Sequence, residues 1–185
     1  MIGSMLFSGC IGIFDRADPT DFELNARRAP PEAFVENTVD NISDLKEYWQ
    51  PKLEEAAVEG ESTGKWKIIN KKYIIVDNKY YSITSTKIGE NEYRYEGRML
   101  ADNKNNFIAF AKSNLVLYRC GSGELSNEAN ERIKTAINTG TYENSPADKT
   151  DKEIFRYIEE NKKSYIFWIE CEGGYYDLLH TLRTH

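Results

Sequence analysis

Tyr80-Tyr81-Ser82-Ile83-Thr84-Ser85-Thr86-Lys87-Ile88 lies in the middle of the stretch 65–120, which decides the fold. The stretch contains short runs rich in Tyr, Ile, Thr, Val and Phe, which favour a pleated, half-buried backbone. Clusters of Asn, Asp, Gly and Lys separate these runs and suit turns. We predict strands at residues 66–69, 73–76, 80–88, 93–100, 107–112 and 115–120. Because the connections are too short for a crossover helix, neighbouring strands are expected to pair antiparallel as a meander.

Apolar residues recur at helical spacing on both sides of this stretch. They predict helices at residues 32–50, 52–59, 127–138 and 150–161, with Pro51 breaking or kinking the first. The later pair carries end signals. Ser126 can cap the third helix, which should stop at Gly140. Thr150 and Glu153 form a capping box for the fourth.

Two further segments complete the expected fold. Residues 165–169 are apolar on both faces, which predicts a strand in the middle of the sheet. Residues 175–182, after two glycines, are expected to form a short helix or an edge strand. The fold class is therefore predicted to be α+β, with one antiparallel meander sheet packed against two or three helices.

Composition excludes several classes of protein. The chain has 185 residues and a net charge of −6, so we expect no nucleic-acid partner, because such binding needs a concentrated basic face. No apolar run approaches the roughly 18–20 residues that span a bilayer. Three cysteines and two histidines lack the spacing of a zinc site, so neither a metal nor another cofactor is expected.

Cys120 and Cys171 each end a predicted strand. If those strands end near one another, a disulfide would close a loop of about 50 residues and stabilise the fold by roughly 4 kcal/mol. The bond requires an oxidising compartment. The alternative is two unlinked cysteines that pack as small apolar side chains.

The N-terminal segment suggests where in the cell the protein is located. Leu6-Phe7-Ser8-Gly9-Cys10 resembles the lipobox of bacterial lipoproteins, in which an apolar residue and two small ones precede a cysteine. The resemblance implies lipid attachment to Cys10 and removal of residues 1–9 as a signal peptide. Residues 10–31 would then form the lipidated cysteine with an extended tether, and residues 32–185 a single α+β domain. The alternative is an ordinary N-terminus with a chance Ser-Gly-Cys.

The residue after the lipobox refines that address. Position 11 is Ile rather than Asp, which by resemblance to lipoprotein sorting implies the outer membrane. The domain would face the periplasm or the cell surface, and several acyl chains would make the membrane anchor stable.

Three short motifs offer an enzymatic alternative. Arg16-Ala17-Asp18, Thr84-Ser85-Thr86 and Glu170-Cys171-Glu172 resemble elements of cholera- and pertussis-type ADP-ribosyltransferase toxins. The resemblance implies NAD as substrate, with Arg16 on a cofactor phosphate and Glu172 stabilising the transition state. Short motifs of this kind also match by chance.

Tyrosines on the predicted strands suggest a binding face. Tyr is amphipathic and common at protein interfaces, and the candidates are Tyr73, Tyr80, Tyr81, Tyr93 and Tyr95. The alternative is that such residues divide between core and surface. The function we expect is non-catalytic binding of another protein by an envelope lipoprotein, as an immunity, inhibitor or exclusion protein. An assembly factor of a secretion machine and the ADP-ribosyltransferase are the alternatives.

Overall fold

The computed structural model describes residues 20–68, 72–162 and 167–184. Within these ranges the chain forms two five-stranded sheets, which we call sheet A (β7-β9-β10-β1-β8) and sheet B (β2-β4-β5-β6-β3). The strands are β1 (Thr20–Arg28), β2 (Val39–Asn41), β3 (Glu61–Gly64), β4 (Lys72–Val76), β5 (Lys79–Gly89), β6 (Glu92–Ala101), β7 (Val116–Arg119), β8 (Thr141–Asn144), β9 (Phe167–Cys171) and β10 (Gly174–Thr184). The helices are α1 (Ala33–Glu36), the 3-10 helix η1 (Ile42–Asp44), α2 (Gln50–Glu59), α3 (Lys104–Asn114), α4 (Asn127–Thr139) and α5 (Lys149–Asn161).

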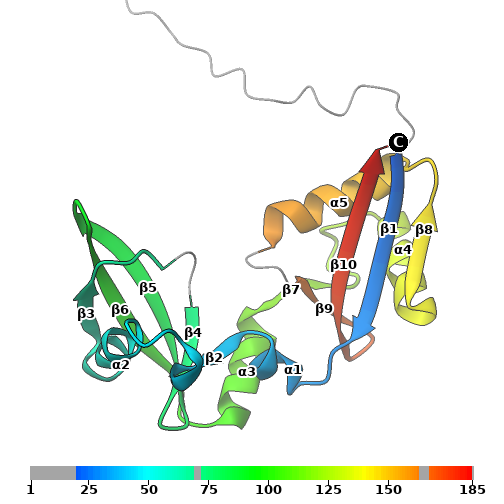
Figure 1. Cartoon of the computed structure of the whole chain (residues 1–185). Coiled ribbons are helices and arrows are strands. Elements are labelled where there is room, and N and C mark those ends of the chain that lie inside the picture. The colour runs from blue at the N-terminus through cyan, green and yellow to red at the C-terminus, as the bar shows by residue number, and fades with distance from the viewer. Residues whose placement is uncertain (1–19, 69–71, 163–166, 185) are drawn as a thin grey trace, which may run out of the picture.

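The α+β class is confirmed, but the strands belong to two sheets and not to one (Figure 1). The predicted meander exists as β4, β5 and β6, which pair antiparallel in sequence order. It ends there because β7 leaves it and pairs in parallel with β9 of sheet A. Helix α3 separates β6 from β7, and this gives the chain room to change sheets.

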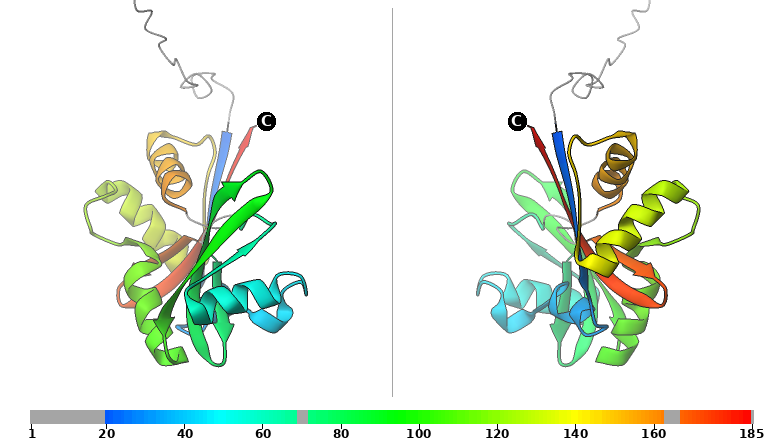
Figure 2. Two further views of the ribbon diagram at one scale, coloured as in Figure 1. Left: turned by 90° about the vertical axis from the view of Figure 1, so that its left-hand side faces the viewer. Right: turned by 90° about the vertical axis from the view of Figure 1, so that its right-hand side faces the viewer.

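Sheet A carries α4 and α5 on one face (Figure 2). Alternate residues of its strands face these helices, so Phe22 and Leu24 of β1 and Leu178 of β10 are buried with Ile133 of α4 and Ile154 of α5. Period-two burial of this kind places one face of each strand in the core. This cluster is the largest of three apolar cores in the described part of the chain.

Sheet B is covered on both sides, by α2 on one and α3 on the other (Figure 2). Gly97 of β6 sets the close approach of α2: its N–H donates to the Gly60 carbonyl at 2.8 Å. A Cβ at Gly97 would lie 2.0 Å from the carbonyl oxygen of Ala56. Any side chain there would push the helix away from the strand.

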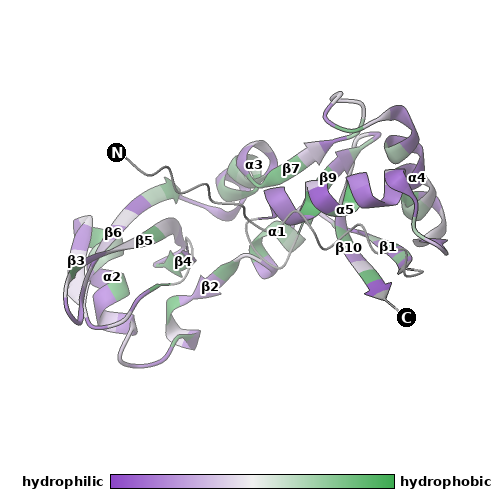
Figure 3. Cartoon of the chain, turned by 90° about the horizontal axis from the view of Figure 1, so that it is seen from above, coloured by the Kyte–Doolittle hydropathy of each residue, from purple (hydrophilic) through white to green (hydrophobic). Residues whose placement is uncertain are grey.

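A third apolar core joins the two sheets through α1 and α3, which lie between them (Figure 3). Phe107 of α3 stacks on Tyr80 of sheet B, with ring centroids 4.7 Å apart. Phe34 of α1 packs on Trp168 of sheet A at 4.5 Å. Because the same core takes side chains from both sheets, the two halves are one packed body.

Residues 107–112, predicted as a strand, form part of α3. The Asn103 side chain accepts the backbone N–H of Asn106 at 2.9 Å and caps the helix. Phe107 and Ala111, four residues apart, are fully buried on one side of it. The strand prediction was wrong because it followed the apolar content and missed this cap and spacing.

Residues 32–50, predicted as one helix, contain α1, β2 and η1 before α2 begins at Gln50. Pro51 lies in the first turn of α2, where the missing N–H has no intrahelical partner to lose. Pro51 therefore starts a helix and does not interrupt one. The helix predicted at 52–59 is confirmed.

The expected tether, residues 10–31, includes strand β1. Phe22 and Leu24 are buried, and β1 pairs along its length with β10 and also with β8. The tether was predicted because the polar residues on one face of β1 were taken to indicate an extended, solvated segment. The predicted signal peptide (residues 1–9), Cys10 and residues 11–19 lie outside the described residues.

The helix ends were predicted unequally well. Helix α4 is capped by Ser126 and ends before Gly140, as expected. The capping box of α5 is made by Asp148 and Asp151, and not by Thr150 and Glu153. A carboxylate at the N-cap accepts N–H groups more strongly than a hydroxyl does.

The C-terminal strands occupy the interior of sheet A. Strand β9 lies between β7 and β10, as its apolar faces indicated, although residues 165 and 166 are outside the described ranges. Strand β10, predicted as a short helix or an edge strand, is the central strand. It can lie there because β1, which sequence analysis had not found, pairs with its other side.

Candidate functional site

The five predicted tyrosines do not form an exposed face. Tyr80, Tyr81 and Tyr95 are buried, and Tyr73 and Tyr93 are half-buried. Tyr80 and Tyr81 are neighbours on β5 and point to opposite sides of sheet B, yet both are covered because α3 packs on one side and α2 on the other. These residues belong to the core and not to a binding face.

An exposed aromatic pair lies elsewhere on the sheet B half, at Tyr48 and Trp66. Tyr48 precedes α2, Trp66 follows β3, and their ring centroids are 5.1 Å apart. Tyr48 is 47% exposed and Trp66 52% exposed, so both residues offer apolar surface to solvent. Large aromatic side chains in such a position are typical anchors of protein–protein interfaces.

The backbone around Trp66 is held by hydroxyl groups of sheet B. The Trp66 N–H donates to the hydroxyl of buried Tyr95 at 3.2 Å, and that hydroxyl donates to the Trp66 carbonyl at 2.7 Å. Two residues later, Ser85 makes the same reciprocal pair with Ile68, at 3.0 and 3.2 Å. The segment is therefore fixed without being a strand, which reduces the entropy that Trp66 would lose on binding.

Three lysines accompany the two rings. Lys65 and Lys67 are exposed on either side of Trp66 in sequence, and the Lys46 Nζ lies 6.0 Å from the centre of the Tyr48 ring. We call Lys46, Tyr48, Lys65, Trp66 and Lys67 the aromatic–lysine patch. The patch was not predicted from the sequence, because the pattern placed Trp66 in a strand and Tyr48 in a helix. The available signal was the run Lys65-Trp66-Lys67, in which an aromatic residue lies between two charges.

We expect Tyr95→Phe to lower the free energy of unfolding by about 1–2 kcal/mol, since it removes both hydrogen bonds that hold Trp66. Urea unfolding followed by circular dichroism measures the loss, and Trp emission should shift to the red as the Trp66 segment loosens. Tyr93→Phe on the same strand is the control and should change stability by less than about 0.5 kcal/mol. Equal behaviour of the two variants would contradict the assigned role of Tyr95.

Cys120 and Cys171 lie side by side at the ends of β7 and β9. Their Cα atoms are 5.0 Å apart, and the structure pairs their sulfurs as a disulfide. The Cys120 N–H also donates to the Glu170 carbonyl at 2.9 Å, which continues the pairing of the two strands. The predicted lipid-attachment residue, Cys10, is outside the described residues.

The motifs that resemble ADP-ribosyltransferases lie apart. Ser85 is on β5 in sheet B, and its hydroxyl is occupied by Ile68. Glu170 lies on β9 in sheet A and pairs with Arg119 at 3.0 Å, while Glu172 follows the strand in a turn with a φ of 52°. Arg16 is outside the described ranges. The hydroxyl motif and the glutamates therefore belong to different sheets.

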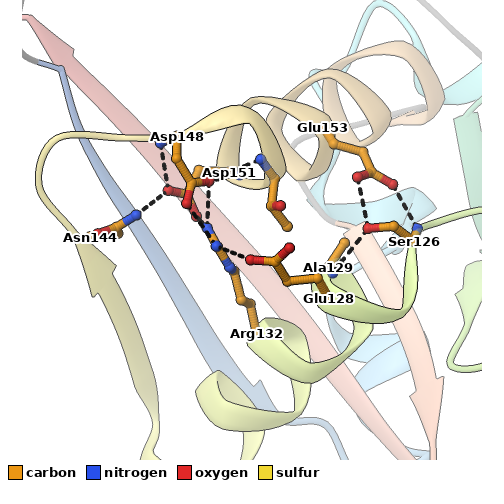
Figure 4. Close-up of polar contacts among 9 residues, drawn as sticks. Ser126, Glu128, Ala129, Arg132, Asn144, Asp148, Asp151 and Glu153 are labelled. Atoms are coloured by element: carbon orange, nitrogen blue, oxygen red, sulfur yellow. Dashed lines mark hydrogen bonds and ion pairs between the residues drawn. The ribbon is translucent and has the colours of Figure 1, made fainter.

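A cluster of charged side chains joins α4 to α5 (Figure 4). The Arg132 guanidinium contacts Asp151 at 2.5 Å, Asp148 at 2.7 Å and Glu128 at 2.6 Å. Hydrogen bonding from Arg132 lowers the pKa of Asp148 to about 2. Each carboxylate of Asp148 and Asp151 also accepts backbone N–H groups at the start of α5. The cluster has the paired charges and cap geometry of a structural link between helices.

Asp177 of β10 is buried without a close cation. Its Oδ1 atom has no hydrogen-bond partner among the described residues, and the Arg27 Nη2 is 4.0 Å from its Oδ2. Trp168, opposite it on β9, likewise has a buried Nε1 with no partner in those ranges. Burial is the main cause that raises the pKa of Asp177, against a smaller opposing effect of Arg27.

We expect Asp177→Asn to be more stable than the parent at pH 7, by about 1 kcal/mol of avoided desolvation. Because burial raises the folded-state pKa, the stability that protonated Asp177 contributes is fully present below its ordinary pKa of 3.8. That stability is lost as the pH rises through the folded-state pKa. The advantage of the variant should therefore be absent near pH 3.5 and present at pH 7. Urea unfolding at both values measures it, with exposed Glu143→Gln as the control. A variant less stable than the parent at pH 7 would refute the argument.

Three other features bear on function: grouped metal ligands, depressions in the surface and membrane-spanning helices. No three His, Cys, Asp or Glu side chains there are grouped to hold a metal ion. A depression of about 370 Å³ beside β1 and β8 is lined partly by side chains that pair with each other, Ser145 with Asp21 and Arg183 with Glu23. None of the described helices has the length and apolarity needed to cross a bilayer.

The aromatic–lysine patch is thus the feature of the described surface that most resembles a recognition site. Its exposed rings, fixed backbone and nearby cations can bind another molecule, and they include no nucleophile paired with a base. No family model matches the chain, and neither the curated proteins nor the solved structures include one significantly similar to it.

Proposed function

We propose that this protein is a bacterial envelope lipoprotein whose domain binds another protein without catalysis, as an immunity, inhibitor or exclusion protein. The observation that carries the proposal is the exposed Tyr48–Trp66 pair, in which the Trp66 backbone is held by the Tyr95 hydroxyl. Interface energy concentrates in a few aromatic anchors, and anchors that are already fixed lose less entropy on binding.

The proposed cellular location rests on different observations. The resemblance of residues 6–10 to a lipobox supports anchoring through Cys10 in the outer membrane. The pairing of Cys120 with Cys171 supports an oxidising compartment such as the periplasm, where structural disulfides persist. Strand β1 begins ten residues after Cys10. Ten fully extended residues reach at most about 35 Å. The domain would then act close to the membrane surface.

Site-specific photo-crosslinking tests the binding function. A photoreactive phenylalanine analogue placed at Tyr48 in the native host should give a discrete adduct after irradiation. The same analogue at Met99, which is 56% exposed on β6, is the control and should give none. An immunity or exclusion role predicts that the cross-linked partner is a toxin or phage component. No adduct at Tyr48, or the same adducts at both positions, would refute binding through this surface.

The address has a separate test. Fractionation of cells that express the parent and Cys10→Ser should place the parent in the membrane and the variant in the soluble fraction. Intact mass should show acyl chains on a parent that lacks residues 1–9, and a variant that keeps residues 1–9 and carries no lipid. A parent protein that retains Met1 and carries no lipid would overturn the envelope assignment and leave the binding surface untouched.

A further inference from the structure

The charges around the Tyr48–Trp66 pair differ from those of the whole chain. The protein carries a net charge of −6, yet residues 46–48 and 65–67 together contain three lysines and one acid, the exposed Glu47. Among the described residues, no carboxylate lies within 4.0 Å of Lys46, Lys65 or Lys67, whereas the ammonium groups of Lys52 and Lys72 each have one at 2.7 Å.

We infer that the partner presents an acidic polypeptide segment with apolar or aromatic side chains to this patch. The inference rests on the proposed binding function and specifies the chemistry of the partner. The rings would cover the apolar side chains, and the lysines would face carboxylates that the domain itself does not supply. Opposite charges around an aromatic centre accelerate association and select among partners.

The packing of the rings favours a polypeptide over a lipid surface. Tyr48 and Trp66 pack against each other with ring centroids 5.1 Å apart, and each residue is about half exposed. Trp49 continues the aromatic group, with the Tyr48 ring 6.1 Å from its own. Aromatic residues grouped in this way are typical anchors of protein–protein interfaces.

Titration of the full chain with a soluble copolymer of glutamate and tyrosine tests the inference. Isothermal calorimetry at low and at physiological salt should show saturable binding that weakens as salt rises. The double variant Lys65→Glu/Lys67→Glu should bind at least tenfold more weakly. Lys79→Glu/Lys104→Glu changes the net charge equally at exposed positions near the other end of β5 and should bind within twofold of the parent. Circular dichroism checks that both variants are folded.

A parallel titration uses vesicles of phosphatidylethanolamine and phosphatidylglycerol. Binding to vesicles but not to copolymer, with the same dependence on Lys65 and Lys67, would overturn the inference in favour of a lipid surface. Equal loss in the two double variants, or no copolymer binding by the parent, would also overturn it. If the Tyr48 photo-adduct persists in those cases, the proposed binding function stands and only the assigned chemistry of the partner is wrong.

Discussion

Arg132→Ala is expected to lower the free energy of unfolding by about 3–5 kcal/mol, because it leaves a buried carboxylate without its cation. Asp151 is fully buried, and the Arg132 guanidinium contacts its Oδ1 at 2.5 Å. Its Oδ2 accepts from the Asn144 amide at 2.6 Å and from the Asp148 N–H at 3.0 Å, contacts that cannot neutralise the charge (Figure 4).

Urea unfolding at pH 7 measures this loss. Lys134→Ala, on the same helix with an exposed partner, is the control and should cost less than about 1 kcal/mol. Adding Asp151→Asn to Arg132→Ala removes the unpaired charge and should recover part of the stability. A loss below about 1 kcal/mol in Arg132→Ala would contradict the structural role of the cluster.

The same cluster predicts acid sensitivity. Asp148 has a folded-state pKa of about 2 against an ordinary 3.8. A lowered folded-state pKa means that its stabilisation is present above 3.8 and is lost as the pH falls toward 2. The difference between the parent and Arg132→Ala should therefore shrink over this interval.

Replacing both Cys120 and Cys171 by serine should destabilise the protein by about 4 kcal/mol on the chain-entropy estimate, since the two positions are 51 residues apart. Reduction of the parent with dithiothreitol should give a comparable shift of the urea midpoint. Thiol titration in denaturant should detect both cysteines only after reduction. If the unreduced parent from the periplasm already exposes these thiols, or if reduction leaves its midpoint unchanged, the bridge and the compartment argued from it are wrong.

Local signals accounted for the parts of the fold that were predicted correctly. Helix α4 was recoverable because Ser126, the apolar spacing and Gly140 all lie within a few residues of one another. The strands β5 and β6 could be predicted because each is a run of β-forming residues with a clear turn signal at both ends. The division into two sheets was not recoverable, since it depends on β7 pairing with β9, across about 50 residues of chain.

Burial was harder to predict than secondary structure. A tyrosine on a strand is exposed or buried according to what covers each face of the sheet, and the strand sequence does not state this. Tyr80 and Tyr81 are both buried because α2 and α3 cover opposite faces, and α3 had itself been mistaken for a strand. The same reasoning explains why Tyr48 and Trp66 were missed, since one was assigned to a helix and the other to a strand, and neither assignment states which side chains stay exposed.

The pairing of β1 with β10 has a consequence for how the chain acquires its fold. Thr20 lies opposite Thr184, so β1 pairs with the last strand of the described chain. Its other neighbour, β8, is also more than 100 residues away. Contacts between such distant segments form slowly, so sheet A stays incomplete until β8 and β10 have been synthesised and have paired with β1. The envelope location proposed above would suit this order of events, because a chain whose sheet A has not yet closed can still pass through a secretion channel.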